Sequence, residues 1–514
     1  MTPSPSSRHH TKRRILRNTV ANSVAQAATM LSTLIFLPLL IRSFGLPVYG
    51  VMALSSSVAT YAVLLDLGVS ATLVRLVAER TAKDDQVGAT RAMFSAVGIY
   101  SVLGVAVALI MFVLGVFAGS LFRVSPSEAE LLRILLWIGA ATQLWYWPTS
   151  VARDGLCGLQ RYDLVSGATF VVVLGDIVGT IYVLVSHQGP VVLLSIRAAE
   201  VVVASLINLV LLTGVLPKAA RRVSASVADV RAILKSGSSI FALQVAQVMS
   251  RQQTDKVVLA VFLGPAAVAI YDIAAKLNSL ISTFIGLTVS AVLPVAAELN
   301  ASEQHDALRS LFLRGTKIVA TLIAPLVTIL IVIAAPFIAA WCGPQYATAV
   351  PVAQILLLSQ ALLPLYQLAD QILIGKNRFH LWVPGGLTMA FVNVILSVAL
   401  VQTLGIVGVA LGTLGAVMVE FPWYASVFGK EMDLPIGDWL LKTAWPMYPL
   451  LIVPAAIAHL GGRTMLGASI IGLAVVAAIA ATVYWAITLG LGYSRVERAD
   501  LLSIVHRASR EGVA

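Results

Sequence analysis

The feature that most constrains this chain is a series of apolar stretches, each about twenty residues long, that recur from Val20 to the region of Gly490. A helix of that length crosses the hydrocarbon core of a bilayer, which is about 30 Å thick. With 59% hydrophobic and 11% charged residues, the 514-residue chain is too apolar for the surface of a soluble protein. The sequence therefore predicts an all-α polytopic membrane protein with about fourteen transmembrane helices joined by short polar connections.

The basic residues indicate how the chain is oriented. Most of the 35 Lys and Arg residues fall on one side of a fourteen-span arrangement, and such residues favour the cytoplasmic side. Both termini are then cytoplasmic, and the basic segment 1–17 is expected to stay uncleaved because the apolar run after it is too long for a signal peptide. Topology and attraction to anionic lipid headgroups explain the net charge of +11, so no nucleic-acid partner is expected.

The chain carries an internal duplication. One ungapped offset aligns Gly45 with Gly264 and Glu79 with Glu298, so the first two spans of each half correspond. Both halves enter the membrane from the same side, which predicts parallel repeats related by an axis along the membrane normal. The expected divisions are a cytoplasmic tail 1–17, an N-lobe of six spans 18–216, a basic cytoplasmic linker 217–236, a C-lobe of six spans 237–429, two further spans 430–490 and a cytoplasmic amphipathic tail 491–514.

Polar side chains follow one face of four helices, the first two spans of each half. A helix that contacts only lipid is apolar all round, whereas a helix that lines a hydrated cavity carries a polar stripe. The duplication and the stripes thus select the same four helices as the walls of a cavity. The residues expected to face it and bind substrate are Asn22, Gln244, Gln247, Arg251, Lys276, Ser279 and Thr283.

Four charged residues are expected to meet in spans seven and eight. Counting about 1.5 Å of rise per residue from the turn between these spans, Arg251 and Lys276 lie at similar depths, with Asp255 and Asp272 nearer the outer surface. Two interpretations stay open. Buried charges normally pair, so salt bridges can lock the hairpin; alternatively, Arg251 and Lys276 bind an anion while Asp255 and Asp272 compete with it and serve in coupling or gating.

Asp66 is a further candidate for coupling or gating. It lies within the membrane on the small, polar face of a helix predicted to run from Tyr49 to about Ala78, and no cation lies within four positions of it on that face. Arg75 and Glu79 belong instead to the solvated end of this helix. Intramembrane carboxylates are usually functional or paired. We therefore expect Asp66 to exchange a proton during transport, unless a cation from another helix pairs with it.

Several classes of chemistry lack their sequence signatures. The GK dipeptides at 375 and 429 are neither followed by Ser or Thr nor preceded by a glycine-rich phosphate loop. His, Cys and carboxylate residues show no metal-ligand spacing. The external loops are too short for the catalytic residues of a membrane glycosyltransferase, so we expect no enzymatic activity, no metal and no cofactor.

Two groups of residues are better explained by packing than by binding. The glycines of GIVGVALGTLG (405–415) permit close contact between helices. Asp176, Arg197 and Glu200, in spans five and six, are expected to form a structural charge network away from the cavity.

Three stretches, in this order and spacing, resemble the polysaccharide transport family of the MOP exporter superfamily, the Wzx-type flippases. They are LPLLIRSFGLPVYGVMAL (37–54), which LLDLGVSATLVR follows; QTDKVVLAVFLGPAAVAIYDIAAKL (253–277); and GKNRFHLWVPGGLTMAFVNVILSVALVQTLGIVGVALGTL (375–414). The resemblance covers nearly the whole chain. It implies a MATE-like fold, in which two pseudo-symmetric six-helix lobes form a V around a central cavity and two C-terminal helices follow.

The resemblance also implies a function. Such a protein would translocate undecaprenyl-pyrophosphate-linked oligosaccharides across the bacterial inner membrane by alternating access, for cell-surface or extracellular polysaccharide. Related flippases hold the substrate pyrophosphate with cavity cations, and Arg251 and Lys276 match that role by position. The implied partners are the lipid-linked oligosaccharide, membrane lipids, and polysaccharide polymerase and chain-length proteins.

Two alternatives stay open. A MATE-type drug antiporter of the same superfamily, coupled to cations, is disfavoured because span one holds no acidic residue. A non-transporting membrane scaffold for glycan assembly would not require four polar stripes.

Overall fold

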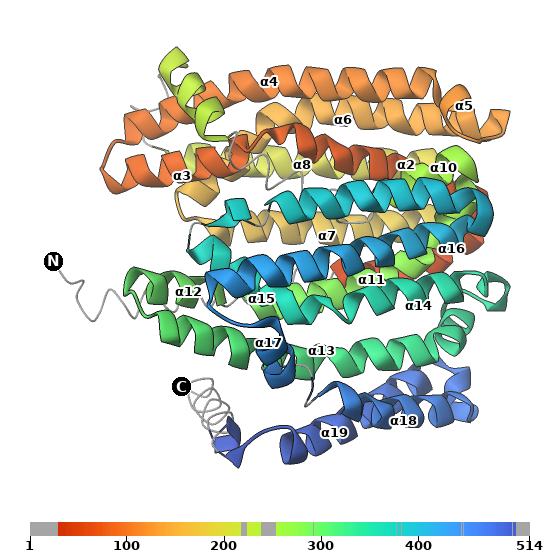
Figure 1. Ribbon diagram of the computed structural model, residues 1–514. Coiled ribbons are helices and arrows are strands. Elements are labelled where there is room, and N and C mark those ends of the chain that lie inside the picture. The colour runs from red at the N-terminus through yellow and green to blue at the C-terminus, as the bar shows by residue number, and fades with distance from the viewer. Residues whose placement is uncertain are drawn as a thin grey trace. The chain divides into compact units, whose positions relative to one another are not determined.

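The computed structural model describes residues 29–216, 224–237, 253–290, 292–376, 378–381, 383–443, 445, 447–495 and 497–499. In this part of the chain all regular structure is helical (Figure 1). The chain divides into two compact units, the first ending at Asp272 and the second beginning at Ile273. The prediction of an all-α polytopic membrane protein is confirmed.

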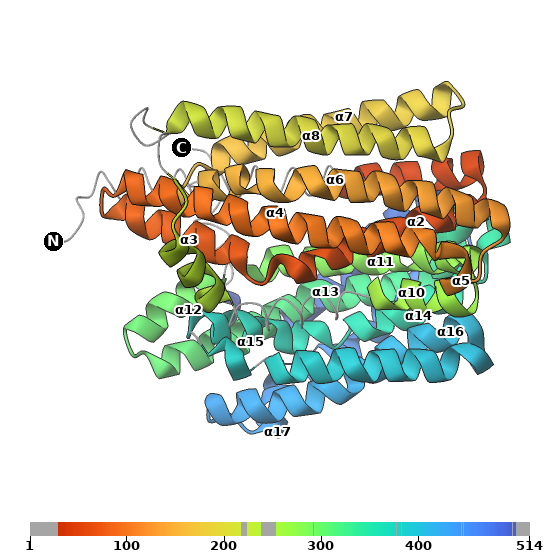
Figure 2. The same ribbon diagram turned by 90° about the horizontal axis from the view of Figure 1, so that it is seen from above.

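The first unit consists of long helices joined by short connections. Its longest helices, α4 and α6, lie side by side, as do α7 and α8 (Figures 1 and 2). The elements are the helix Thr29–Phe44, α2 (Leu46–Tyr61), the 3₁₀ helix η1 (Ala62–Asp66), α3 (Val69–Ala82), α4 (Gln86–Val116), α5 (Ala118–Leu121), α6 (Pro126–Gly158), α7 (Tyr162–Val185), α8 (Pro190–Val215), α10 (Gln253–Phe262) and the beginning of α11 (Pro265–Ser290).

Local sequence sets where α4 and α6 begin. The Asp85 side chain accepts a hydrogen bond from the Gly88 backbone N–H at the start of α4. At the start of α6, the Ser125 backbone N–H donates to Glu128 and the Glu128 backbone N–H donates to the Ser125 hydroxyl, which completes a capping box. These bonds satisfy donors that have no partner inside the helix.

The second transmembrane helix is broken, contrary to the prediction of one continuous helix from Tyr49 to about Ala78. α2 tightens into η1, and Leu67 (φ 53°) and Gly68 (φ 74°) then adopt left-handed conformations before α3 begins. A left-handed residue cannot continue a right-handed helix, and a residue with a side chain adopts this conformation at a cost. Asp66 therefore lies at a helix break rather than in the middle of a helix.

A helical segment within the predicted basic linker packs against this break. Residues 227–237 are helical, and a Cβ atom added to Gly237 would lie 2.5 Å from the Leu67 carbonyl oxygen. Asp229 is buried and forms an ion pair with Arg80 of α3, whose guanidinium also donates to the Gly88 carbonyl at 2.6 Å. The charged end of α3 is thus partly a packing surface and not only a solvated helix terminus.

The internal duplication is visible in the backbone. Gly45 (φ 83°) and Gly264 (φ 90°) both have a positive φ, and each directly precedes the second helix of its repeat. Glycine occupies this region without the steric cost that a Cβ atom imposes. The correspondence between these positions extends from the sequence to local structure.

The second unit contains the rest of α11 and a set of helices around α13. Aromatic side chains form much of its core: the Phe312 ring lies 4.6 Å from that of Phe428 and 4.9 Å from that of Trp439. The elements are α12 (Val292–Ala301), α13 (His305–Trp341), η3 (Pro344–Tyr346), α14 (Ala349–Gln360), α15 (Leu363–Gly375), η4 (Phe379–Leu381), α16 (Val383–Glu431), α17 (Ile436–Thr443), η5 (Tyr448–Leu451), α18 (Ile452–Gly462), η6 (Met465–Ala468) and α19 (Ile470–Leu491).

Eight helices in the described part are long and apolar enough to cross a membrane, or up to ten if each of two bent pairs is one span. The first pair is α14 with α15, bent by 48°, and the second is α17 with the segment Tyr448–Gly462, bent by 42°. In this count α16 is one helix, although it contains a non-helical residue at Gly405. The number of fourteen spans stays a prediction.

α16 is a hairpin that turns at Gly405 (φ 60°, ψ −135°). Its two arms touch through glycine, since a Cβ atom on Gly408 would lie 2.3 Å from the Leu400 carbonyl oxygen. Farther along, the Asn393 side chain donates a hydrogen bond to the Thr413 hydroxyl at 3.0 Å. The packing role predicted for the glycines of 405–415 is confirmed.

The glycine contact in α16 gives a stability prediction. Gly408→Ala places a methyl group where backbone atoms already lie, so we expect the free energy of unfolding to fall by about 1–3 kcal/mol. Gly98→Ala in α4 is the matched control, because nothing lies within 4 Å of its added Cβ; its better helix propensity predicts a gain of up to about 1 kcal/mol. Unfolding curves in detergent check both, and equal stability of the two variants would contradict the packing argument.

Candidate functional site

An ion pair joins α10 to the start of α11. The Lys256 ammonium lies 2.6 Å from one carboxylate oxygen of Asp272, and the Tyr49 hydroxyl of α2 donates a hydrogen bond to the other oxygen at 2.6 Å. All three side chains lie in the interior of the first unit. Close by, a Cβ atom on Gly50 would lie 1.9 Å from the Pro265 carbonyl oxygen, so α2 and α11 approach backbone to backbone.

The other carboxylate of this hairpin is held in a similar way. Asp255 is fully buried and accepts a short hydrogen bond from the Tyr271 hydroxyl. At the preceding residue, the Tyr61 hydroxyl of α2 donates to the Thr254 hydroxyl at 2.7 Å. Tyrosines from α2 and α11 thus supply hydrogen bonds to α10 and to Asp272, and these bonds lock the three helices together.

Lys256 was not predicted as the partner of Asp272. The sequence predicted instead that Asp272 lies beside Arg251 and Lys276, and Arg251 lies outside the described residues. A signal was present, because Lys256 and Asp272 are equally far along the chain from the turn residue Gly264. Positions equidistant from a tight turn lie opposite each other in a helical hairpin.

The described part of the cavity stripe lies on α11. Lys276 is half-buried, Ser279 is exposed and Thr283 is half-buried, at successive helical turns. The Ser279 and Thr283 hydroxyls donate to the backbone carbonyls of Lys276 and Ser279, each at 2.8 Å. Their oxygens remain able to accept hydrogen bonds from a ligand. The other predicted cavity residues lie outside the described residues: Asn22, Gln244, Gln247 and Arg251.

Asp66 is buried at the helix break and has partners from two elements. The Tyr100 hydroxyl of α4 donates a hydrogen bond to its carboxylate at 2.6 Å. The Ser70 backbone N–H, in the first turn of α3, donates to the same oxygen at 3.3 Å. A negative side chain at this place satisfies a helix N-terminus and complements its dipole. The carboxylate thus stabilises the start of α3 and fixes α4 against it.

A second buried acid lies next to Asp66. Asp154 of α6 neighbours Asp66, Ser70 and Tyr100, and its carboxylate is 3.7 Å from the guanidinium of Arg153. Sequence reasoning missed Asp154, because nothing in its local pattern shows that α6 returns to the break between η1 and α3. Two carboxylates and one cation, from η1 and α6, form this cluster with Tyr100 of α4 and Ser70 of α3.

The second unit has its own pair of intramembrane carboxylates. The Tyr366 hydroxyl of α15 donates to Glu420 of α16 at 3.0 Å, and the Tyr424 hydroxyl of α16 donates a short hydrogen bond to Asp370 of α15. Each helix therefore contributes one tyrosine and one acid, a single turn apart, and the pairs cross. Among the described residues, no Lys or Arg forms an ion pair with either acid.

This crossed arrangement was also missed. Its only sequence signal is the spacing of four residues within each helix, Tyr366 to Asp370 and Glu420 to Tyr424. That spacing places the two side chains on one face of a helix. It does not show that the two faces meet.

The charge network predicted for spans five and six is present. The Arg197 guanidinium of α8 donates to Asp176 of α7 at 2.8 Å. Glu200 lies one turn from Arg197 and packs beside Gly175 and Gly179 of α7. This network joins neighbouring helices of the first unit, in agreement with a structural role.

Comparisons with known proteins identify the family and the fold. A profile of the family described as polysaccharide biosynthesis protein matches residues 15–300, whereas curated protein sequences give no significant match. An inward-facing multidrug resistance MATE family transporter of the MOP superfamily is 19% identical, with a TM-score of 0.66 over 78% of this chain and 95% of its own. Lipid II flippase MurJ, in an inward closed conformation, is 13% identical, with a TM-score of 0.65 over 92% of this chain and 98% of its own.

A third solved structure, a MOP superfamily transporter from Pyrococcus furiosus, is 17% identical, with a TM-score of 0.58 over 82% of this chain and 97% of its own. At these identities the likeness establishes the fold alone, and that fold is the one shared by MATE transporters and lipid II flippase. The family profile covers more than half of the sequence. The chain therefore belongs to the polysaccharide biosynthesis protein family of membrane proteins.

Proposed function

We propose that this protein is a flippase that moves undecaprenyl-pyrophosphate-linked oligosaccharides across the bacterial inner membrane, with both termini in the cytoplasm. The observation that carries the proposal is the family match over residues 15–300, which links the chain to polysaccharide biosynthesis. The fold is shared with a flippase of a lipid-linked precursor. Export of a lipid-linked glycan is a step of polysaccharide biosynthesis that this fold can perform without catalysing a reaction.

The substrate chemistry agrees with the polar stripe of α11. A pyrophosphate carries negative charge that must be neutralised inside a membrane, and Arg and Lys are the side chains that do so. In this proposal Lys276 and Arg251 bind the pyrophosphate, while Ser279, Thr283, Asn22, Gln244 and Gln247 bind polar groups of the substrate. Because Lys256 already pairs with Asp272, the proposal assigns Asp272 and Asp255 chiefly to holding the hairpin.

A reconstituted assay tests this function and its alternatives. Proteoliposomes that contain the purified chain and a fluorescent undecaprenyl-pyrophosphate oligosaccharide are expected to move the lipid between leaflets, measured as the fraction open to an external glycan-cleaving enzyme. Lys276→Gln and Arg251→Gln should each slow this movement about tenfold or more, since a hydrogen bond to a charged group contributes about 1.5–3 kcal/mol. Lys430→Gln, at an exposed lysine at the end of α16, is the matched control for loss of charge.

Other outcomes of this assay would support one of the alternative functions. Transport of a cationic drug against an ion gradient, without movement of the labelled lipid, would identify a drug antiporter. A properly folded chain that moves neither would be a scaffold.

Coupling to a proton gradient requires a group that changes its protonation state as the cavity opens. Charged carboxylates are costly in hydrocarbon, and the clusters at Asp66 and Asp370 place such groups inside the membrane spans. Alternating access exposes membrane-embedded sites to water on one side at a time. We therefore propose that acids of both clusters bind protons in one conformation and release them in another.

Two substitutions at Asp66 separate coupling from capping. Asp66→Asn keeps an oxygen for the Tyr100 hydroxyl and the Ser70 N–H but cannot ionise, so thermal stability should stay near that of the wild type while stimulation of flipping by a pH gradient is lost. Asp66→Ala removes the cap and should lower stability by about 1 kcal/mol or more. If Asp66→Asn kept full stimulation by the gradient, Asp66 would have a structural role only.

The crossed pairs of the second unit give an independent test. Asp370→Asn keeps an acceptor for the Tyr424 hydroxyl, and we expect it to abolish the dependence of flipping on a pH gradient while leaving downhill exchange of the labelled lipid measurable. Tyr424→Phe is the companion variant, because it removes the hydrogen bond but leaves the carboxylate able to titrate. A normal gradient response in Asp370→Asn, together with a lost response in Asp66→Asn, would place coupling in the first unit.

A further inference from the structure

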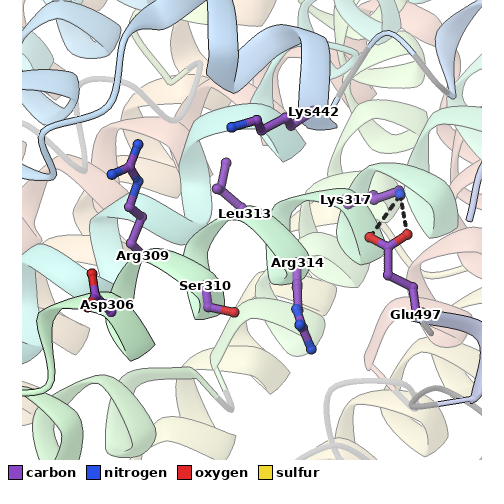
Figure 3. Close-up of a pocket in the computed structure, with 8 residues that line it drawn as sticks. All are labelled: Asp306, Arg309, Ser310, Leu313, Arg314, Lys317, Lys442 and Glu497. Carbon is purple, nitrogen blue, oxygen red and sulfur yellow. Dashed lines mark hydrogen bonds and ion pairs between the residues drawn. The ribbon is translucent and has the colours of Figure 1, made fainter. Parts of the chain in front are cut away.

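A basic groove lies in the second unit, at the end of the spans where α13 begins. Its volume is about 550 Å³, and its walls come from the first turns of α13, from α17 and from the segment after α19. Figure 3 shows its lining side chains. The charged residues among them are Asp306, Arg309, Arg314, Lys317, Lys442 and Glu497.

One end of the groove is closed by an internal ion pair. The Lys317 ammonium is buried and lies 3.0 Å from both carboxylate oxygens of Glu497 (Figure 3). It also lies 4.5 Å from the centroid of the Tyr493 ring. The Ser494 backbone N–H donates to Glu497 at 2.8 Å, so the segment after α19 is held against α13. These contacts neutralise Lys317 and Glu497 within the protein.

The other end of the groove carries the positive charges of Arg309 and Lys442 beside one acid, Asp306 (Figure 3). Arg309 is half-buried and forms no ion pair with an acidic side chain of the described residues. Within the described part of the chain, Lys442 pairs only with Asp438, one turn away at 3.5 Å, and both side chains are more than half exposed. Such a surface pair contributes little and is easily replaced. Arg309 and Lys442 point into the same space from α13 and α17, with Leu313 between them (Figure 3).

The surroundings of Lys442 indicate that this space lies at the level of lipid headgroups. Leu441 and Trp445 flank it and are 60% and 69% exposed, whereas Trp439 on the opposite side of α17 is fully buried in the core. A short helix with an exposed tryptophan and leucine beside a lysine is typical of the membrane interface. At the end of α19, Leu491 is 76% exposed. An anion that reaches the groove from this apolar rim is one attached to a lipid.

We propose that this groove binds the phosphate of an anionic phospholipid, with Arg309 and Lys442 as its ligands. A guanidinium and an ammonium that face one space match the oxygens of a phosphate diester, and Leu441, Trp445 and Leu491 contact its acyl chains. The bound lipid bridges α13 and α17, beside the Lys317–Glu497 pair that holds the segment after α19 to α13. The site is separate from the proposed transport pathway, so its test does not depend on transport.

The experiment measures lipid retention by the full-length protein. The purified chain is mixed with defined amounts of phosphatidylglycerol or phosphatidylcholine in detergent, and the bound lipid is counted by native mass spectrometry. We expect preferential binding of phosphatidylglycerol, and a decrease of about tenfold or more in the double variant Arg309→Gln/Lys442→Gln, because each basic residue near anionic lipid contributes about 1 kcal/mol. Lys430→Gln removes one exposed charge outside the groove and should bind like the wild type.

A second double variant controls for loss of binding that is caused by misfolding. Arg309→Lys/Lys442→Arg keeps both charges and should retain most of the binding. The proposal is overturned if Arg309→Gln/Lys442→Gln binds phosphatidylglycerol normally, or if Lys430→Gln loses binding to the same extent, which would indicate general charge attraction. Displacement of phosphatidylglycerol by inorganic phosphate at equal concentration would also overturn it, because the site would then serve a soluble anion.

Discussion

An ionisable side chain inside a bilayer must be partnered, and partners supplied by other helices tie the helices of each unit together. Asp272 satisfies this requirement with Lys256 of α10 and Tyr49 of α2, and Asp370 satisfies it with Tyr424 of α16. Removing one partner would leave a buried charge or an unsatisfied polar group, which costs several times what the contact itself contributes. The buried acids therefore specify which helices meet, and the apolar surfaces around them supply most of the stability.

The helix break at Leu67 and Gly68 gives Asp66 a position that a continuous helix would not allow. Its carboxylate accepts hydrogen bonds from the start of α3 and from Tyr100 of α4. Gly237, at the end of the helical segment 227–237, lies against the backbone of the same break. A change in the charge of Asp66 would alter hydrogen bonds at one point where three segments meet. Small local shifts at such a point can be passed to whole helices, because packed interfaces switch between arrangements rather than deform smoothly.

The features that could be predicted from the sequence are those that depend on residues of a single helix or that repeat along the chain. Apolar length predicted the membrane class, the matched Gly45 and Gly264 predicted the duplication, and the glycines around Gly408 predicted the close helix contact that the structure shows within α16. The break after Asp66 could not be predicted, because a leucine in a left-handed conformation is held there by tertiary contacts.

The polar clusters could not be predicted from local sequence patterns either. Tyr366 and Glu420 belong to different helices, and no periodicity within either helix indicates their contact. Lys256 was the one missed partner with a usable signal, since the turn at Gly264 fixes which positions of the hairpin face each other. Pairing across a turn can thus be deduced from sequence, whereas pairing between distant helices needs the fold.

The acid clusters of the two units differ in a way that bears on coupling. In the first unit the guanidinium of Arg153 lies 3.7 Å from Asp154. Of the two neighbouring carboxylates, Asp154 and Asp66, the first therefore has a counter-charge close by. In the second unit Asp370 and Glu420 each accept a hydrogen bond from a tyrosine hydroxyl, which supplies no charge. The free-energy cost of keeping two carboxylates charged is therefore less compensated in the second unit. This cost falls when water enters. A conformational change that admits water there alters the charge state more, which makes Asp370 and Glu420 the stronger candidates for linking protons to movement.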